Sequence, residues 1–106
     1  MDTLYERIIK SFLDVLILAK LKNTGAPLSG YDFIRLVSRE FNTLISSGTI
    51  YTLLYSMERE GLIKGLSRGG KRVYALTEKG NEDAKELANS SDRILSLVKE
   101  ILMKIE

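Results

Sequence analysis

The sequence predicts a mainly α-helical protein with one small β-hairpin, on the strength of three observations. Apolar residues recur at helical spacing in three segments before residue 61. Two short strand-like runs then flank Gly69-Gly70, a recognised hairpin signal. A heptad series begins at Ala84 and continues to the C-terminus. This order predicts a winged helix-turn-helix over residues 1–76, followed by a long C-terminal dimerisation helix over residues 77–106.

The first helix is expected over residues 3–22. Its apolar side chains lie on almost every face, so it needs covering on more than one side. It therefore lies either in the middle of the domain or partly against another subunit. Gly25 and Pro27 then mark a loop.

The second helix is expected over residues 30–40. Ser29 and Asp32 form a start that resembles a capping box, with Ser29 as the N-cap. Its apolar positions predict that Tyr31, Ile34 and Val37 are buried. A short link joins it to the third helix, as in a helix-turn-helix.

The third helix is expected over residues 47–60, between the N-cap Ser46 and Gly61, a residue suited to closing a helix. One face carries the apolar residues Ile50, Leu53, Leu54 and Met57. The opposite face carries the polar side chains of Thr49, Tyr51, Thr52, Tyr55, Ser56 and Arg59. Such groups suit phosphates and base edges in a major groove, although an ordinary surface helix has a similar composition. Glu58 and Glu60 are expected to be solvated.

The hairpin is expected over residues 62–76. Residues 61–76 hold four cations and no acid, and these cations are Lys64, Arg68, Lys71 and Arg72. A solvated loop also favours Lys and Arg. Beside a polar-faced helix, however, a basic hairpin with a Gly-Gly tip favours contact with a polyanion.

The last helix is expected over residues 77–106, with Thr77 as its cap. Its heptad positions are Ala84, Leu87, Ser91, Ile94, Val98, Ile101 and Ile105. This apolar face either folds back on the first helix or pairs with a second copy of the chain. We favour the second arrangement, because a chain of 106 residues has little core with which to cover two such helices.

Composition excludes most catalytic chemistry. The chain has no cysteine and no histidine, so thiol catalysis, disulfides and Cys or His zinc sites are excluded. It also has no Gly-rich phosphate loop, and we expect no enzymatic activity, no cofactor and no metal. The net charge is only +2. Neither a signal peptide nor a membrane-spanning run is evident, so we expect a cytoplasmic protein without a membrane partner.

Four motifs resemble the PadR family of prokaryotic transcriptional regulators. They are Leu28-Ser29-Gly30-Tyr31-Asp32, Ser47-Gly48-Thr49-Ile50-Tyr51, the run from Leu54 through Met57-Glu58-Arg59-Glu60-Gly61-Leu62-Ile63, and Tyr74-Ala75-Leu76-Thr77-Glu78-Lys79-Gly80. The single terminal helix is similar to that of the shorter PadR-type proteins. Thr52 stands where the family usually has Pro, and Ser29 where it often has His. The resemblance implies a winged helix-turn-helix regulator, and family members often respond to small molecules held between subunits.

We therefore expect a homodimeric, sequence-specific DNA-binding regulator, in particular a repressor that binds an inverted-repeat operator. The third helix would enter the major groove, and the basic hairpin would hold the flanking backbone or minor groove. The residues available to DNA are Ser46, Ser47, Thr49, Tyr51, Thr52, Tyr55, Ser56, Lys64, Arg68, Lys71 and Arg72. The residues expected at the dimer interface are Leu4, Ile8, Phe12, Leu87, Ile94, Val98, Ile101 and Ile105.

Two further expectations concern partners. A small-molecule effector would bind at the dimer interface, among the apolar positions of the first and last helices. The alternative to a DNA-binding regulator is a winged-helix protein-protein interaction module, in which the same helix and hairpin meet an acidic protein.

Overall fold

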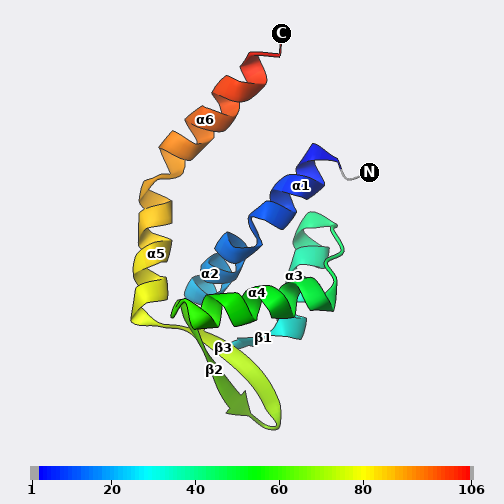
Figure 1. The fold of residues 1–106 in the computed structure, drawn as a ribbon, viewed down its shortest axis with the longest axis vertical. Helices are drawn as coiled ribbons and strands as arrows, with labels where there is room; N and C mark the ends of the chain where they lie inside the picture. Colours follow the sequence, from blue (N-terminus) through cyan, green and yellow to red (C-terminus); the bar gives the residue numbers. More distant parts are fainter. Residues whose placement is uncertain (1–2, 106) are drawn as a thin grey trace.

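Residues 3–105 are described by a computed structural model, so the outer ends of the ranges 1–76 and 77–106 lie outside the described residues. Within residues 3–105 the chain forms six helices and a three-stranded antiparallel sheet (Figure 1). In chain order the elements are α1 (Leu4–Ser11), α2 (Leu13–Thr24), β1 (Leu28–Ser29), α3 (Gly30–Phe41), α4 (Ser47–Arg59), β2 (Ile63–Arg68), β3 (Lys71–Leu76), α5 (Glu78–Asn89) and α6 (Ser91–Met103).

The core lies where α2, α3 and α4 meet the base of the sheet. Its most deeply buried large side chains are Phe33, Ile17, Ile50, Leu54 and Ile63. These residues come from one element each, apart from two on α4, so the hydrophobic effect ties the helix-turn-helix and the hairpin into one unit. The expected helical face of α4 is confirmed at its centre, since Ile50 and Leu54 are completely buried.

The predicted capping box at the start of α3 is confirmed. Ser29 Oγ accepts the N–H of Asp32 at 3.2 Å, and the carboxylate of Asp32 accepts the N–H of Ser29 at 2.9 Å. The expectation that Tyr31 is buried is wrong, because 59% of this residue is exposed. The buried face of α3 instead passes through Phe33 and Val37, which are one helical turn apart.

The hairpin forms as β2 and β3, with Arg68 paired with Lys71 at its outer end. Gly69 and Gly70 connect the strands with φ values of +57° and +78°. Positive φ at both positions belongs to the two-residue turn that matches the twist of a hairpin, and glycine adopts it without steric penalty. The two-residue strand β1, which was not predicted, pairs with the other edge of β3. It is too short to show an alternating pattern in the sequence.

The single helix expected over residues 3–22 is divided into α1 and α2 at Phe12, whose φ and ψ are −100° and 12°. The break leaves the first N–H groups of α2 without helical acceptors. The N–H of Val15, in that first turn, is donated instead to Oδ1 of Asp14 at 2.8 Å.

The single helix expected over residues 77–106 is also divided, at Ser90. The hydroxyl of Ser90 donates to the carbonyl oxygen of Glu86 at 2.9 Å, a bond that bends helices. Helix α5 begins at the N-cap Thr77, as expected, and its residues Ala84 and Leu87 pack against the core. Helix α6 has no buried residue among those described and extends away from the body of the molecule (Figure 1).

Candidate nucleic-acid interface

The N-terminal end of α4 is held by its own hydroxyls. Ser46 Oγ accepts the N–H of Thr49 at 3.1 Å and shares a second hydrogen bond with the hydroxyl of Thr49, at 2.8 Å. Ser46 is therefore the N-cap, as predicted, and Thr49 is its partner. Both side chains have a structural role in addition to the DNA contact predicted for them, which stays a prediction.

Space is open beside the first turn of α4. Ser47 and Gly48 are both exposed, and a Cβ added to Gly48 would meet no atom within 4 Å. The N–H groups of a first helical turn point outward along the axis and favour an anion. A phosphate could therefore approach the backbone here without displacing any described atom.

The outer face of α4 is polar and accessible. Tyr51, Thr52, Tyr55 and Ser56 are exposed, as the spacing predicts. Tyr51 differs from the others because its ring lies against Gly30, at the start of α3. Tyr55 is 63% exposed and has the guanidinium of Arg59 over its ring, with Cζ 5.7 Å from the ring centroid.

The wing cations fall into two groups. Lys64, Arg68 and Lys71 are exposed on β2 and β3, and the last two lie opposite each other at the end of the hairpin. Like charges directly opposite each other in a sheet are destabilising. A bound anion at the hairpin end would relieve this repulsion.

Arg72 belongs to a different environment. Its Nη2 donates to Oε2 of Glu58 on α4 at 2.7 Å, and this bond raises the pKa of Arg72 above its ordinary value. Glu58, which was expected to be solvated, is 31% exposed, and its carboxylate is also an ion-pair partner of the wing. No local signal could have revealed this pair, since its members are 14 residues apart and on different elements.

A hollow of about 640 Å³ lies between α4 and the wing. Its lining residues are Tyr51, Tyr55, Glu58 and Arg59 from α4, with Arg72 and Tyr74 from β3. The polar face of α4 and the basic hairpin therefore border one continuous surface. Three phenols and two guanidinium groups can donate hydrogen bonds there, and one carboxylate accepts them.

The residues predicted for dimerisation lie on or beside α1, α5 and α6. Leu4, Ile8 and Phe12 are exposed on or beside α1, and Val98 and Ile101 are exposed on α6. Ile105, just beyond α6, is 78% exposed. Ile94 is partly buried on α6, whereas Leu87 on α5 packs against the core.

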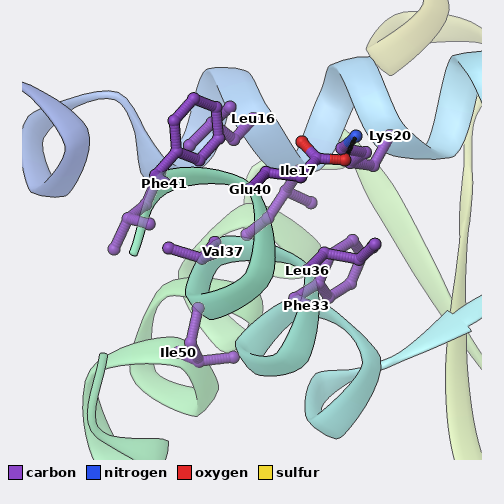
Figure 2. Close-up of a pocket in the computed structure, with 10 residues that line it drawn as sticks. Leu16, Ile17, Lys20, Phe33, Leu36, Val37, Glu40, Phe41 and Ile50 are labelled. Carbon is purple, nitrogen blue, oxygen red and sulfur yellow. Dashed lines mark hydrogen bonds and ion pairs between the residues drawn. The ribbon is translucent and has the colours of Figure 1, made fainter. Parts of the chain in front are cut away.

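The interior offers no room for an organic ligand between α2 and α3. The cavity there is about 10 Å³, and its apolar walls include Phe33, Val37 and Ile50 (Figure 2). That volume is near the lower limit for one water molecule. An ion pair between Lys20 and Glu40 lies at its edge.

Residues 3–105 contain no group of three or more acidic side chains arranged to hold a metal ion. Within the same residues, no helix combines the length and apolar character needed to cross a membrane.

Known structures share this fold. A PadR-like transcriptional regulator from Bacillus cereus strain ATCC 14579 is 27% identical, with a TM-score of 0.73, over 91% of this chain and 96% of that one. A PadR family transcription regulator from Clostridium difficile R20291 is 24% identical, with a TM-score of 0.70, over 86% and 98% of the two chains. F93 from STIV, a winged-helix DNA-binding protein, is 23% identical, with a TM-score of 0.65, over 81% and 91%.

The winged-helix fold expected from the sequence is therefore confirmed. A comparison with curated proteins finds no match. The transcriptional regulator PadR-like family matches residues 17–86, and all four motifs lie within that range. Members of this family are transcriptional regulators and not enzymes. The chain belongs to the PadR-like family of transcriptional regulators.

Proposed function

We propose that the protein is a homodimeric, sequence-specific DNA-binding repressor. The observation that carries the proposal is the continuous surface on which the polar face of α4 borders the basic wing. A helix of this kind fits the major groove, and cations beside it fit the flanking phosphates. Since its target is DNA, we place the protein in the cytoplasm.

Base contacts would come from the outer face of α4, and backbone contacts from the wing. The open first turn at Ser47 and Gly48 would hold a phosphate, because N–H groups at the start of a helix face an anion; among them, the N–H of Thr49 is already bonded to Ser46 Oγ. Lys64, Arg68 and Lys71 would neutralise phosphates on either side of the groove. Binding should therefore weaken steeply as the salt concentration rises.

The dimer is supported by the apolar surface of α1 and α6. An isolated helix as short as α6, with 13 residues, is marginal in water, and this one has no buried residue. A second copy of the chain would cover these side chains with the same surface by two-fold symmetry. The two α4 helices would then meet half-sites about 34 Å apart, so the operator should be an inverted repeat.

Any small-molecule effector would bind between the two subunits. The cavity between α2 and α3 is too small for one, as described above. The apolar side chains exposed on α1 and α6 would instead form the walls of such a site in the dimer.

Selection of duplexes from a random-sequence pool tests the proposal. We expect the protein to enrich an inverted repeat, and the affinity for that duplex to fall steeply with salt. Light scattering should give the mass of two chains. If no duplex is enriched, or if binding is insensitive to salt, the protein is not a sequence-specific regulator. A winged-helix module that binds an acidic protein would then be the better description.

A further inference from the structure

One carboxylate on α4 contacts both strands of the wing. Oε2 of Glu58 accepts the backbone N–H of Gly65 in β2 at 3.2 Å and the Nη2 donor of Arg72 in β3 at 2.7 Å. The carboxylate lies in the last full turn of α4, one residue before the end of that helix. The pair of bonds therefore ties the hairpin to the proposed recognition helix at a single point.

Three neighbours determine where the guanidinium of Arg72 lies: two contact it, and the third leaves room for it. Glu58 bonds to it, and the ring of Tyr74 lies beneath it, with Cζ 5.7 Å from the ring centroid. The third neighbour is Gly65, which has no side chain where the guanidinium lies. A Cβ on Gly65 would be 2.5 Å from Cζ and 2.8 Å from Nε of Arg72, so any larger residue would displace the guanidinium.

A carboxylate is out of place on a surface that meets DNA. Glu58 lines the hollow between α4 and the wing, where its negative charge would repel a phosphate. If it acted through charge alone, its removal would strengthen DNA binding. Its contacts indicate a different role, because they fix the position of a cation.

Arg72 retains the capacity to bind an anion while it is held. Its side chain is 57% exposed, and a guanidinium has five N–H donors, of which the bond to Glu58 uses one. The remaining donors border the hollow, which Arg59 also lines from the opposite element. A backbone phosphate in the hollow would therefore meet two guanidinium groups.

We propose that Glu58 is a positioning residue for DNA binding, which holds Arg72 and the wing so that a backbone phosphate binds in the hollow between Arg72 and Arg59. This inference rests on the proposed function and adds to it a phosphate site and the residue that aligns it. The ligand is a phosphodiester of the bound duplex.

The test uses the full chain and a duplex selected from a random pool by the wild-type protein. Dissociation constants are measured for this duplex and for an unrelated duplex of equal length, at several salt concentrations. We expect E58Q to weaken binding of the selected duplex by about tenfold and to lower the preference for it over the unrelated one. The control is E82Q, which removes a carboxylate from an exposed position on α5 and should not weaken binding.

A second variant reaches the same guanidinium without changing any charge. Gly65 is not among the glycines with positive φ, so G65A is compatible with the strand and displaces only the end of a flexible side chain. We expect G65A to weaken the selected duplex as E58Q does. In an R72Q background neither change should weaken binding further, because the cation that they position is absent. Thermal unfolding shows whether each variant is folded.

The outcomes distinguish failure of the positioning role of Glu58 from failure of the proposed DNA-binding function. Loss of binding in E58Q and G65A, together with no added loss in R72Q, supports the positioning role. If E58Q and E82Q both bound the duplex more tightly than the wild type and to the same extent, the positioning role would be overturned. It would also be overturned if E58Q or G65A weakened binding in the R72Q background as much as in the wild type. If the wild-type protein selects no duplex at all, the proposed function fails and this inference with it.

Discussion

The phenol ring of Tyr51 lies directly against the backbone of Gly30. A Cβ on Gly30 would be 2.5 Å from Cε1 and 2.7 Å from Cζ of that ring, closer than real side chains approach. The first residue of α3 and a residue in the second turn of α4 are thus packed with no intervening space. Because Tyr51 is still 48% exposed, one side chain both joins the two helices and faces the proposed DNA surface.

Replacing Gly30 with Ala should displace the ring of Tyr51. The atoms in the way are the outer end of a half-exposed side chain, which can turn aside, so the cost should roughly cancel the gain of about 0.5–1 kcal/mol from replacing a helical glycine. We expect little change in the free energy of unfolding in urea, but weaker binding of a selected duplex, because the ring leaves its place on the proposed DNA surface. The matched background is Y51A, in which the ring is absent and G30A should not weaken binding further. An equal loss of binding in that background would mean that the ring is not the cause.

Replacing Gly48 with Ala should separate stability from binding. The new Cβ meets no described atom within 4 Å, so the fold should keep its stability or gain up to about 1 kcal/mol. The same methyl group would stand in the path of a phosphate at the first turn of α4. We therefore expect weaker DNA binding in gel-shift titrations. An unchanged affinity for DNA would show that the DNA backbone does not approach Gly48.

Replacing Gly80 with Ala should destabilise the protein severely. A Cβ there would overlap the backbone carbonyl of Leu62 and lie 3.1 Å from Cδ2 of Leu76. Backbone atoms cannot move aside as a flexible side chain can, so we expect a loss of about 2 kcal/mol or more in thermal unfolding. Glu82 lies on the same helix and is exposed, so E82A is the control. Equal melting temperatures for the two variants would contradict this packing.

A charge on the exposed face of α6 should produce monomers. Ile101 is 54% exposed and lies on the heptad face, so I101D should prevent two copies from burying that face. The body should stay folded, because α6 contributes no buried residue. Light scattering measures the mass of the particle in solution. The control is K99D, which places an aspartate elsewhere on α6 and should leave the mass unchanged. A dimer that survives I101D would exclude this face as the interface.

Removing a cation from the wing end should reduce the salt dependence of binding. Each phosphate contact contributes about 0.9 to the slope of log affinity against log salt, so R68Q and K71Q should each lower that slope by about one. R93Q removes a cation from an exposed site on α6 and should leave the slope unchanged. Equal slopes in all three variants would show that the wing end does not touch phosphate.

Local signals made much of the fold predictable. The N-caps Ser29, Ser46 and Thr77 each bond to a backbone N–H three residues ahead, a contact that the sequence alone specifies. The Gly69-Gly70 turn is equally local, because two adjacent positive φ values require residues of this kind. These signals fix where the elements begin and how the hairpin closes.

The parts that escaped prediction are contacts between distant residues and bends within the helical segments. The pairs Glu58–Arg72 and Gly30–Tyr51 join separate elements, and neither residue type indicates its partner. The bends at Phe12 and Ser90 occur without proline or glycine, and their apolar periodicity continues across the break. Beside each bend a side chain makes a short-range hydrogen bond to the backbone, at Asp14 and at Ser90.

The bend at Ser90 has a consequence for operator choice. Helix α6 follows directly after that bend, and it carries three of the eight residues proposed to meet the second copy, namely Ile94, Val98 and Ile101. In the proposed dimer, the angle at residue 90 would therefore set the distance between the two α4 helices. A substitution at this serine would change the number of base pairs between half-sites while every base-contacting residue stays the same. Spacing and sequence preference would thus be free to evolve separately.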